Sequence, residues 1–207
     1  LDGAENSGNI TIKEGSSTIN DVVMVAGVCG CFAAGTGKNF SNSGNIVIEK
    51  GFSSGKILHL GGCVGWTNKT LTTLRNSGNI TVEGGTVGAL SSAGNDKKIL
   101  NLGGNVGWVD TKLTMKDMEN SGDITIKGLT AKYTMSVAGN VARYNSADGT
   151  GGSGTNLKNS GAIYIDENSS TGGGLYVGGC VGIHQLHNSG NFTNCENDAP
   201  ITLKPSV

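Results

Sequence analysis

The tripeptide Asn-Ser-Gly recurs along this chain of 207 residues and constrains its fold more than any other feature. Its copies are separated by 29 to 44 residues, which suits stacked repeats joined by loops of different length. The copies begin at Asn6, Asn42, Asn76, Asn120, Asn159 and Asn188. We expect these asparagines to occupy one structural corner, where each amide bonds to the next unit and forms a ladder. The neighbouring glycine is expected to permit a positive φ there.

Three short strands can be aligned in each unit around this corner. The first follows the tripeptide, where Ile alternates with Thr, Val or Tyr, as in Ile10–Ile12; this is the period of a half-buried strand. The second contains Val/Leu-Gly-Gly-x-Val-Gly, as at Leu60–Gly65, and we expect its Leu/Val face to be core. Its opposite face of small residues is expected to be a solvent or contact surface. The third precedes the next asparagine, and the last copy of the first strand loses its pattern at Asn194.

A unit of this kind cannot bury its apolar faces alone, so equivalent strands must stack in parallel. No segment has the 3.6-residue apolar period of a helix. Because parallel connections favour the right hand, the sequence predicts an all-β, right-handed parallel β-helix (β-solenoid). We expect about five to six coils with three short strands each. Residues 1–195 are expected to form a single solenoid domain cut from a longer array, and residues 196–207 a C-terminal tail or cap.

Composition excludes several other classes of protein. Glycine is abundant (36 residues), but two prolines and no three-residue glycine period rule out collagen. An apolar fraction of 36% and a net charge of −1 do not fit a disordered chain. No basic run tracks phosphates, so we expect no nucleic-acid partner. No stretch approaches the roughly 20 apolar residues of a membrane helix, so we expect no membrane insertion.

The repeats also resemble a known pattern. Asn-Ser-Gly-x-Ile, followed by Val/Leu-Gly-Gly-x-Val-Gly and a short apolar run back to Asn, is similar to the glycine-rich repeats called GLUG-type. The resemblance covers roughly residues 4–195. It implies a large secreted or surface-anchored bacterial protein, often adhesin-like, with an extracellular or cell-surface location. It implies no catalytic residues.

Two tryptophans give the clearest candidate for ligand binding. Trp66 and Trp108 fall in one repeat column, which the other units fill with Cys31, Arg143 and Ile183. Adjacent aromatic rings can form a platform for the apolar faces of sugars. Alternatively, the two rings end the core column and cover it at a corner. Both interpretations stay open at this stage.

Other chemical groups fit ordinary repeat positions. His59 alternates with Leu58 and Leu60, so we expect it to point away from the core and lie at the surface. Acidic residues recur after the first strand together with lysines, which indicates a solvated edge rather than a catalytic cluster. The five cysteines show no paired metal-site spacing. We expect no catalytic residues, no metal and no cofactor.

These observations favour a non-catalytic extracellular module that serves as an adhesin stalk or binding surface. Its expected partners are host or microbial glycans or surface proteins, together with further repeats stacked end to end. A polysaccharide-active β-helix enzyme, a lyase or hydrolase, is the alternative from another class. A purely structural spacer without a ligand is the third.

Overall fold

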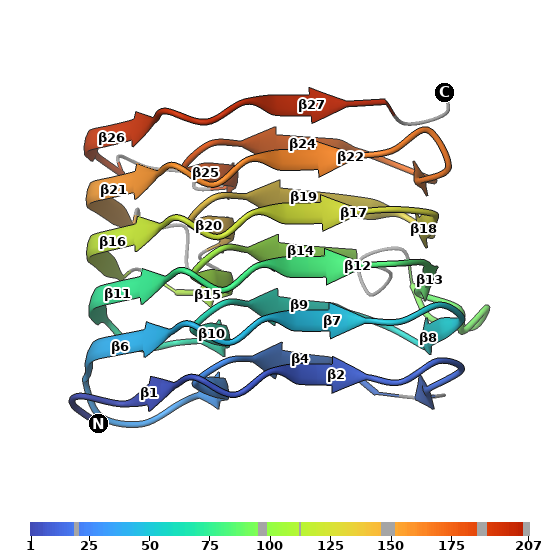
Figure 1. The fold of residues 1–207 in the computed structure, drawn as a ribbon, viewed down its shortest axis with the longest axis horizontal. Coiled ribbons are helices and arrows are strands. Elements are labelled where there is room, and N and C mark those ends of the chain that lie inside the picture. Colours follow the sequence, from blue (N-terminus) through green and yellow to red (C-terminus); the bar gives the residue numbers. More distant parts are fainter. Residues whose placement is uncertain (19–20, 95–98, 112, 146–151, 186–189, 205–207) are drawn as a thin grey trace.

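A computed structural model describes the chain except residues 19–20, 95–98, 112, 146–151, 186–189 and 205–207. The described residues form an all-β stack of about five turns in which every strand pairing is parallel, and none of them is helical. Figure 1 shows the coils rising from the N-terminal coil in blue to the C-terminal coil in red. The predicted β-solenoid is therefore confirmed.

Five parallel sheets run along the stack, and we name them A to E in the order in which the chain visits them. Sheet A contains β1 (Glu5–Asn6), β6 (Gly37–Asn42), β11 (Leu71–Asn76), β16 (Thr114–Asn120), β21 (Ser153–Asn159) and β26 (Phe192–Asn197). Sheet B contains β2 (Ile10–Ile12), β7 (Ile46–Ile48), β12 (Ile80–Val82), β17 (Ile124–Ile126), β22 (Ile163–Ile165) and β27 (Ile201–Leu203). Sheet C contains β3 (Ser17–Thr18), β8 (Phe52–Ser54), β13 (Gly85–Val87), β18 (Leu129–Ala131) and β23 (Ser170–Thr171).

The remaining two sheets complete each turn. Sheet D contains β4 (Val23–Ala26), β9 (Leu58–Gly61), β14 (Ile99–Gly103), β19 (Thr134–Ala138) and β24 (Leu175–Gly178). Sheet E contains β5 (Cys29–Phe32), β10 (Val64–Thr67), β15 (Val106–Asp110), β20 (Val141–Asn145) and β25 (Val181–Gln185).

Each coil thus has five strand segments where the sequence predicted three. Sheets A and B are the predicted third and first strands. The predicted second strand is two strands, because the chain bends at Gly62–Cys63 between β9 and β10. Sheet C was not predicted, since its strands are only two or three residues long and rich in Ser, Thr and Gly.

The apolar residues form two cores side by side. One lies among sheets B, C and D and includes Leu58 and Leu60, which are fully buried as predicted for the Leu/Val face. The other lies between sheets A and E and includes Leu74 and Val64. In Figure 1 the strands of sheets A and E lie on the left, and those of sheets B, C and D on the right. The solenoid therefore has two lobes in cross-section.

The asparagine column lies at the waist between the two lobes. The Asn42 Nδ2 donates to Asn76 Oδ1 at 2.8 Å and to the Gly44 carbonyl at 2.8 Å, and the pattern repeats from coil to coil. Asn76 is almost fully buried. Opposite it lies Gly62, where an added β-carbon would be 2.4 Å from Asn76 Cγ. The second glycine of Gly-Gly is thus required because the asparagine fills the space that a side chain would need.

The glycine of Asn-Ser-Gly has a different role from the one expected. Gly44, Gly78, Gly122 and Gly161 are not among the residues with positive φ. A β-carbon on Gly78 would lie 2.0 Å from the Gly44 carbonyl oxygen of the coil below. Close stacking of the corners, rather than a left-handed backbone, therefore excludes a side chain there. Non-glycine residues with a left-handed φ recur in sheet A instead, at Asn39, Thr73, Asp117, Asn156 and Asn194.

The last coil differs from the literal repeat. Asn188 lies outside the described residues, and the sixth position of the ladder is filled by Asn197, whose Oδ1 accepts from Asn159 Nδ2 at 2.7 Å. Residues 191–194, expected to copy the first strand, lie in or next to β26 of sheet A. Ile201–Leu203 takes the place in sheet B. The segment 196–207, expected as a tail or cap, therefore contributes the end of β26 and all of β27 to the stack.

Candidate functional site

Sheet E carries the two tryptophans side by side on consecutive coils. Trp66 pairs in register with Trp108, and the column continues to Cys31 below and to Arg143 and Ile183 above. Both indoles are half-buried, and neither belongs to one of the two apolar cores. Their alignment follows from the repeat, because Val64 and Val106 fix the register of β10 and β15 inside the A–E core.

The tryptophan column faces the outer side of sheet D. After the bend at Gly62–Cys63, sheet E folds back so closely that a β-carbon on Gly107 would lie 2.9 Å from the Leu60 nitrogen. The small residues of the Gly-rich strand thus make a contact surface and not a solvent surface. This fold-back covers His59, Asn101 and Ser136 in the outward column of sheet D. His59, expected at the surface, has only 1% of its area exposed, because the rings of Trp108 and His59 lie 4.8 Å apart between centroids.

His59 is held in its neutral form. Burial, reinforced by the positive charge of Arg143, lowers the pKa of His59 to about 3. The Asn101 Nδ2 lies 3.1 Å from His59 Nδ1. Because an amide nitrogen can only donate, Nδ1 is the acceptor and the imidazole proton resides on Nε2.

Polar atoms without partners collect in this layer between sheets D and E. Five buried side-chain nitrogen or oxygen atoms in the described part of the chain have no hydrogen-bond partner. Four of them are here: Asn101 Oδ1, Ser136 Oγ, Trp108 Nε1 and Arg143 Nε. Buried polar groups are nearly always hydrogen-bonded. Such a cluster is therefore exceptional in this fold and marks the layer as a place for water or a polar ligand.

Arg143 borders the same layer at its open end. Its Nη2 donates to Gln185 Oε1 at 2.6 Å, and its Cζ lies 5.9 Å from the centroid of the Trp108 ring. Burial lowers the pKa of Arg143, while Tyr176 and Asp110 act in the opposite direction. The guanidinium lines a hollow of about 190 Å³ together with Tyr133, Thr134, Tyr176, Ile183 and Gln185. None of the four ion pairs found among the described residues involves Arg143.

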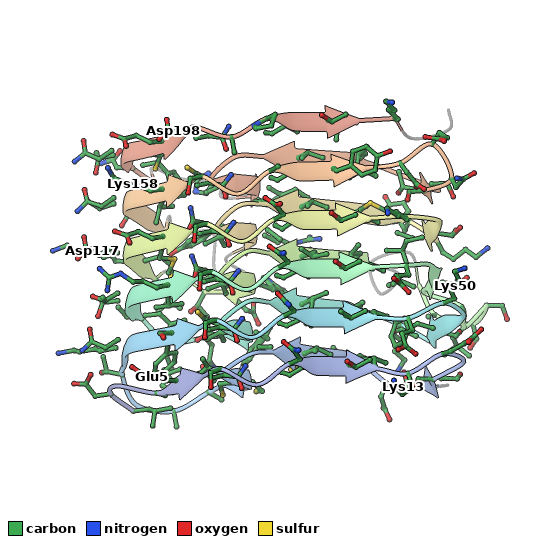
Figure 2. All side chains as sticks on the ribbon, in the orientation of Figure 1. Glu5, Lys13, Lys50, Asp117, Lys158 and Asp198 are labelled. Atoms are coloured by element: carbon green, nitrogen blue, oxygen red, sulfur yellow. The ribbon has the colours of Figure 1, made fainter. Side chains whose placement is uncertain are left out.

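A larger groove of about 420 Å³ runs along the outer side of the asparagine column. Both of its cations are paired, since Arg75 lies 3.1 Å from Glu119 in the groove and Lys158 lies 2.9 Å from Glu196 on the next coil. Figure 2 shows Lys158 and Asp198 on this side of the molecule, with Lys13 and Lys50 at the opposite end of the cross-section. We therefore place the candidate site at the tryptophan column, where an unpaired charge and aromatic rings meet.

The acidic residues after sheet B do not form a catalytic cluster with one another. Glu49 accepts from Lys13 at 3.2 Å, while Asp166 is bound within its own turn by Ser169. In the part of the chain that the structure describes, no three His, Cys, Asp or Glu side chains are grouped so that they could hold a metal ion. The same residues contain no helix that is long and apolar enough to span a membrane.

Sequence reasoning placed Trp66 and Trp108 in one column but assigned no role to the residues around them. The one sequence feature that could have indicated Arg143 as a site residue is its position in that same column. Tyr176 shares a column with His59, Asn101 and Ser136, which pair in register along sheet D. The fold-back that joins the two columns could not be read from the period of either strand.

The parallel stack and its recurring columns define a β-solenoid repeat protein. No protein-family model, no curated protein and no solved structure matches the chain.

Proposed function

We propose that this chain is a non-catalytic, GLUG-type extracellular module of a bacterial surface or secreted protein, and that its tryptophan column binds glycans. The observation that carries the proposal is the in-register pair of Trp66 and Trp108 on adjacent coils. Consecutive coils are about 4.8 Å apart. Half-buried rings at this spacing, beside buried polar atoms, offer apolar and polar contacts to a sugar chain that lies along the solenoid axis.

Binding to a glycan array tests this proposal directly. Trp66→Ile and Trp108→Ile are suitable variants because Ile183 already occupies the same column in another coil. The double variant is expected to lose binding to every glycan that the native chain recognises, by roughly tenfold or more, since stacked aromatic rings dominate such contacts. Circular dichroism melting curves establish that the variant stays folded.

Tyr164→Thr provides a matched control. It removes a half-buried aromatic ring from the outward column of sheet B, where the neighbouring coil carries Thr125. This variant is expected to bind as the native chain does. Unchanged binding by the double tryptophan variant would contradict the proposed site. Release of reducing ends from a polysaccharide would contradict the non-catalytic role and favour the enzyme alternative, and absence of binding to any glycan would favour the structural spacer.

A further inference from the structure

We propose that the hollow at Arg143 binds the acidic group of a negatively charged sugar, such as a uronic acid or a sulfated residue. This inference rests on the proposed glycan-binding function and names the substrate class of the same site. The hollow adjoins the end of the tryptophan column, because Arg143 pairs in register with Trp108. A glycan lying along the column would therefore bring one residue next to the guanidinium.

The first observation behind this inference is the distribution of exposed aromatic residues. Among the Phe, Trp and Tyr side chains that the structure describes, two are exposed to solvent. Tyr133 exposes 38% of its area and Tyr176 exposes 45%. Both line the hollow of Arg143. A tyrosine offers an apolar ring to the C–H face of a sugar and a hydroxyl to its polar groups. Their clustering at one small hollow is the pattern expected of a sugar subsite.

The second observation is the state of the arginine. Arg75 and Arg143 differ in their surroundings, because Arg75 is paired with Glu119 while no carboxylate in the described residues lies within ion-pair distance of Arg143. Asp110 is near enough to raise the pKa of Arg143 but forms no ion pair with it. Gln185 and the Trp108 ring fix the position of the guanidinium. A preorganised, partly buried arginine is suited to planar carboxylate or to sulfate oxygens.

The size of the hollow limits the ligand further. Its volume of about 190 Å³ lies below the 300–1,000 Å³ typical of pockets that enclose drug-sized molecules. It therefore accommodates a single sugar ring or its charged substituent, and the rest of the glycan must lie outside, along Trp108 and Trp66. In this arrangement the two tryptophans provide affinity for the glycan, and Arg143 provides the preference for a negatively charged sugar.

The test compares three probes by isothermal titration calorimetry: oligogalacturonate, its methyl ester, and a κ-carrageenan oligosaccharide, which carries sulfate but no uronic acid. The native chain is expected to bind at least one of the two charged probes roughly tenfold or more tightly than the neutral ester. Preference for oligogalacturonate indicates a carboxylate site, and preference for the carrageenan probe indicates a sulfate site. Equal binding of the charged and neutral probes would overturn the inference without any substitution.

Variants separate this inference from the proposed function. Arg143→Ile, which copies the Ile183 of the next coil, is expected to abolish the preference for charge, so that the charged probes and the neutral ester bind with similar affinity. Arg143→Lys is expected to retain part of the preference, because the charge remains but the planar fork is lost. Arg75→Gln, which removes the other arginine, should change neither. If Trp108→Ile abolishes binding but Arg143→Ile leaves the preference for charged probes intact, the glycan-binding proposal stands and the inference about Arg143 is wrong. The inference is also wrong if none of the three probes binds the native chain.

Discussion

At the scale of single residues, His59 links the candidate site to acid stability. The fold holds the pKa of His59 at about 3, whereas an unfolded histidine has a value of 6.5. Below pH 6.5 the unfolded chain takes up a proton that the folded chain does not. The stabilising contribution of neutral His59 is therefore complete above pH 6.5 and is lost progressively as the pH falls towards 3.

We predict that His59→Asn makes the free energy of unfolding less dependent on pH below 6.5. Asparagine fits this column, because Asn101 occupies it in the next coil. The full pKa shift corresponds to an upper limit of about 5 kcal/mol, and the pH-dependent loss should shrink by a large part of that amount. Urea denaturation between about pH 7 and about pH 3.5 covers this window and measures the effect. His184→Asn, at an exposed histidine, should change the slope far less, and equal slopes for His59→Asn and the native chain would contradict the prediction.

At the scale of the elements, close stacking of corners determines which residues the repeat tolerates. We predict that Gly78→Ala destabilises the protein by at least about 2 kcal/mol, because its β-carbon would lie 2.0 Å from a backbone oxygen that cannot move independently. Gly8→Ala is the matched control at the same repeat position. In the first coil the β-carbon would be 3.7 Å from Asn6 Oδ1, an ordinary contact, so the change should be close to neutral. Denaturant midpoints compare the two variants, and equal losses would show that spacing between coils is not the constraint.

The elements that sequence predicted are those whose side chains alternate strongly. Ile80 and Val82 of β12 are fully buried around an outward Thr81, and this pattern alone identifies sheet B. Sheet C gives no such signal, because Ser54 and Ala131 occupy the same inward column as Val87. Short polar strands are ordered there by their neighbours in adjacent coils rather than by their own periodicity.

The bend between sheets D and E shows a second limit of sequence reasoning. An unbroken period of two from Leu58 to Trp66 suggested one strand, yet the strand ends at Gly61 and a new one begins at Val64. The Gly-Gly pair permits the bend, but glycine is required there because the Asn76 side chain fills the space that a β-carbon on Gly62 would occupy. The site residues could be assigned to columns, whereas their meeting across the bend depends on a tertiary contact.

The register of the last coil could have been predicted from the alternating pattern instead of the tripeptide. Asn197 is followed four residues later by Ile201, as Asn6 is followed by Ile10, although no Ser-Gly intervenes. The separation of 38 residues from Asn159 also agrees with the other ladder steps. The physical requirement is an asparagine in the waist and an apolar residue in sheet B, and the tripeptide is only its commonest form.

At the scale of the whole molecule, a stack in which each coil contacts only its neighbours should be most stable in the middle. The inward residues show this gradient: Ile80 is fully buried at the centre, Ile10 is half-buried in the first coil, and Leu203 is 44% exposed in the last. We predict that backbone amides of β9, β12 and β14 exchange with deuterium most slowly, while those of β2 and β27 exchange fastest. Mass spectrometry of peptides across the chain measures the gradient, and uniform protection from end to end would show that the coils unfold as one cooperative unit.

The same measurement tests the expected end-to-end stacking. The first and the last strand of each sheet both have an edge without a partner in the described structure, and such edges favour pairing with another strand. If copies of this chain stack, raising the protein concentration should slow exchange in β2 and β27 while β12 stays unchanged. Mutating Leu203→Lys, which places a charge at the exposed edge of sheet B, should remove the concentration dependence at β27. Exchange at both ends that is independent of concentration would restrict the stack to the coils of a single chain.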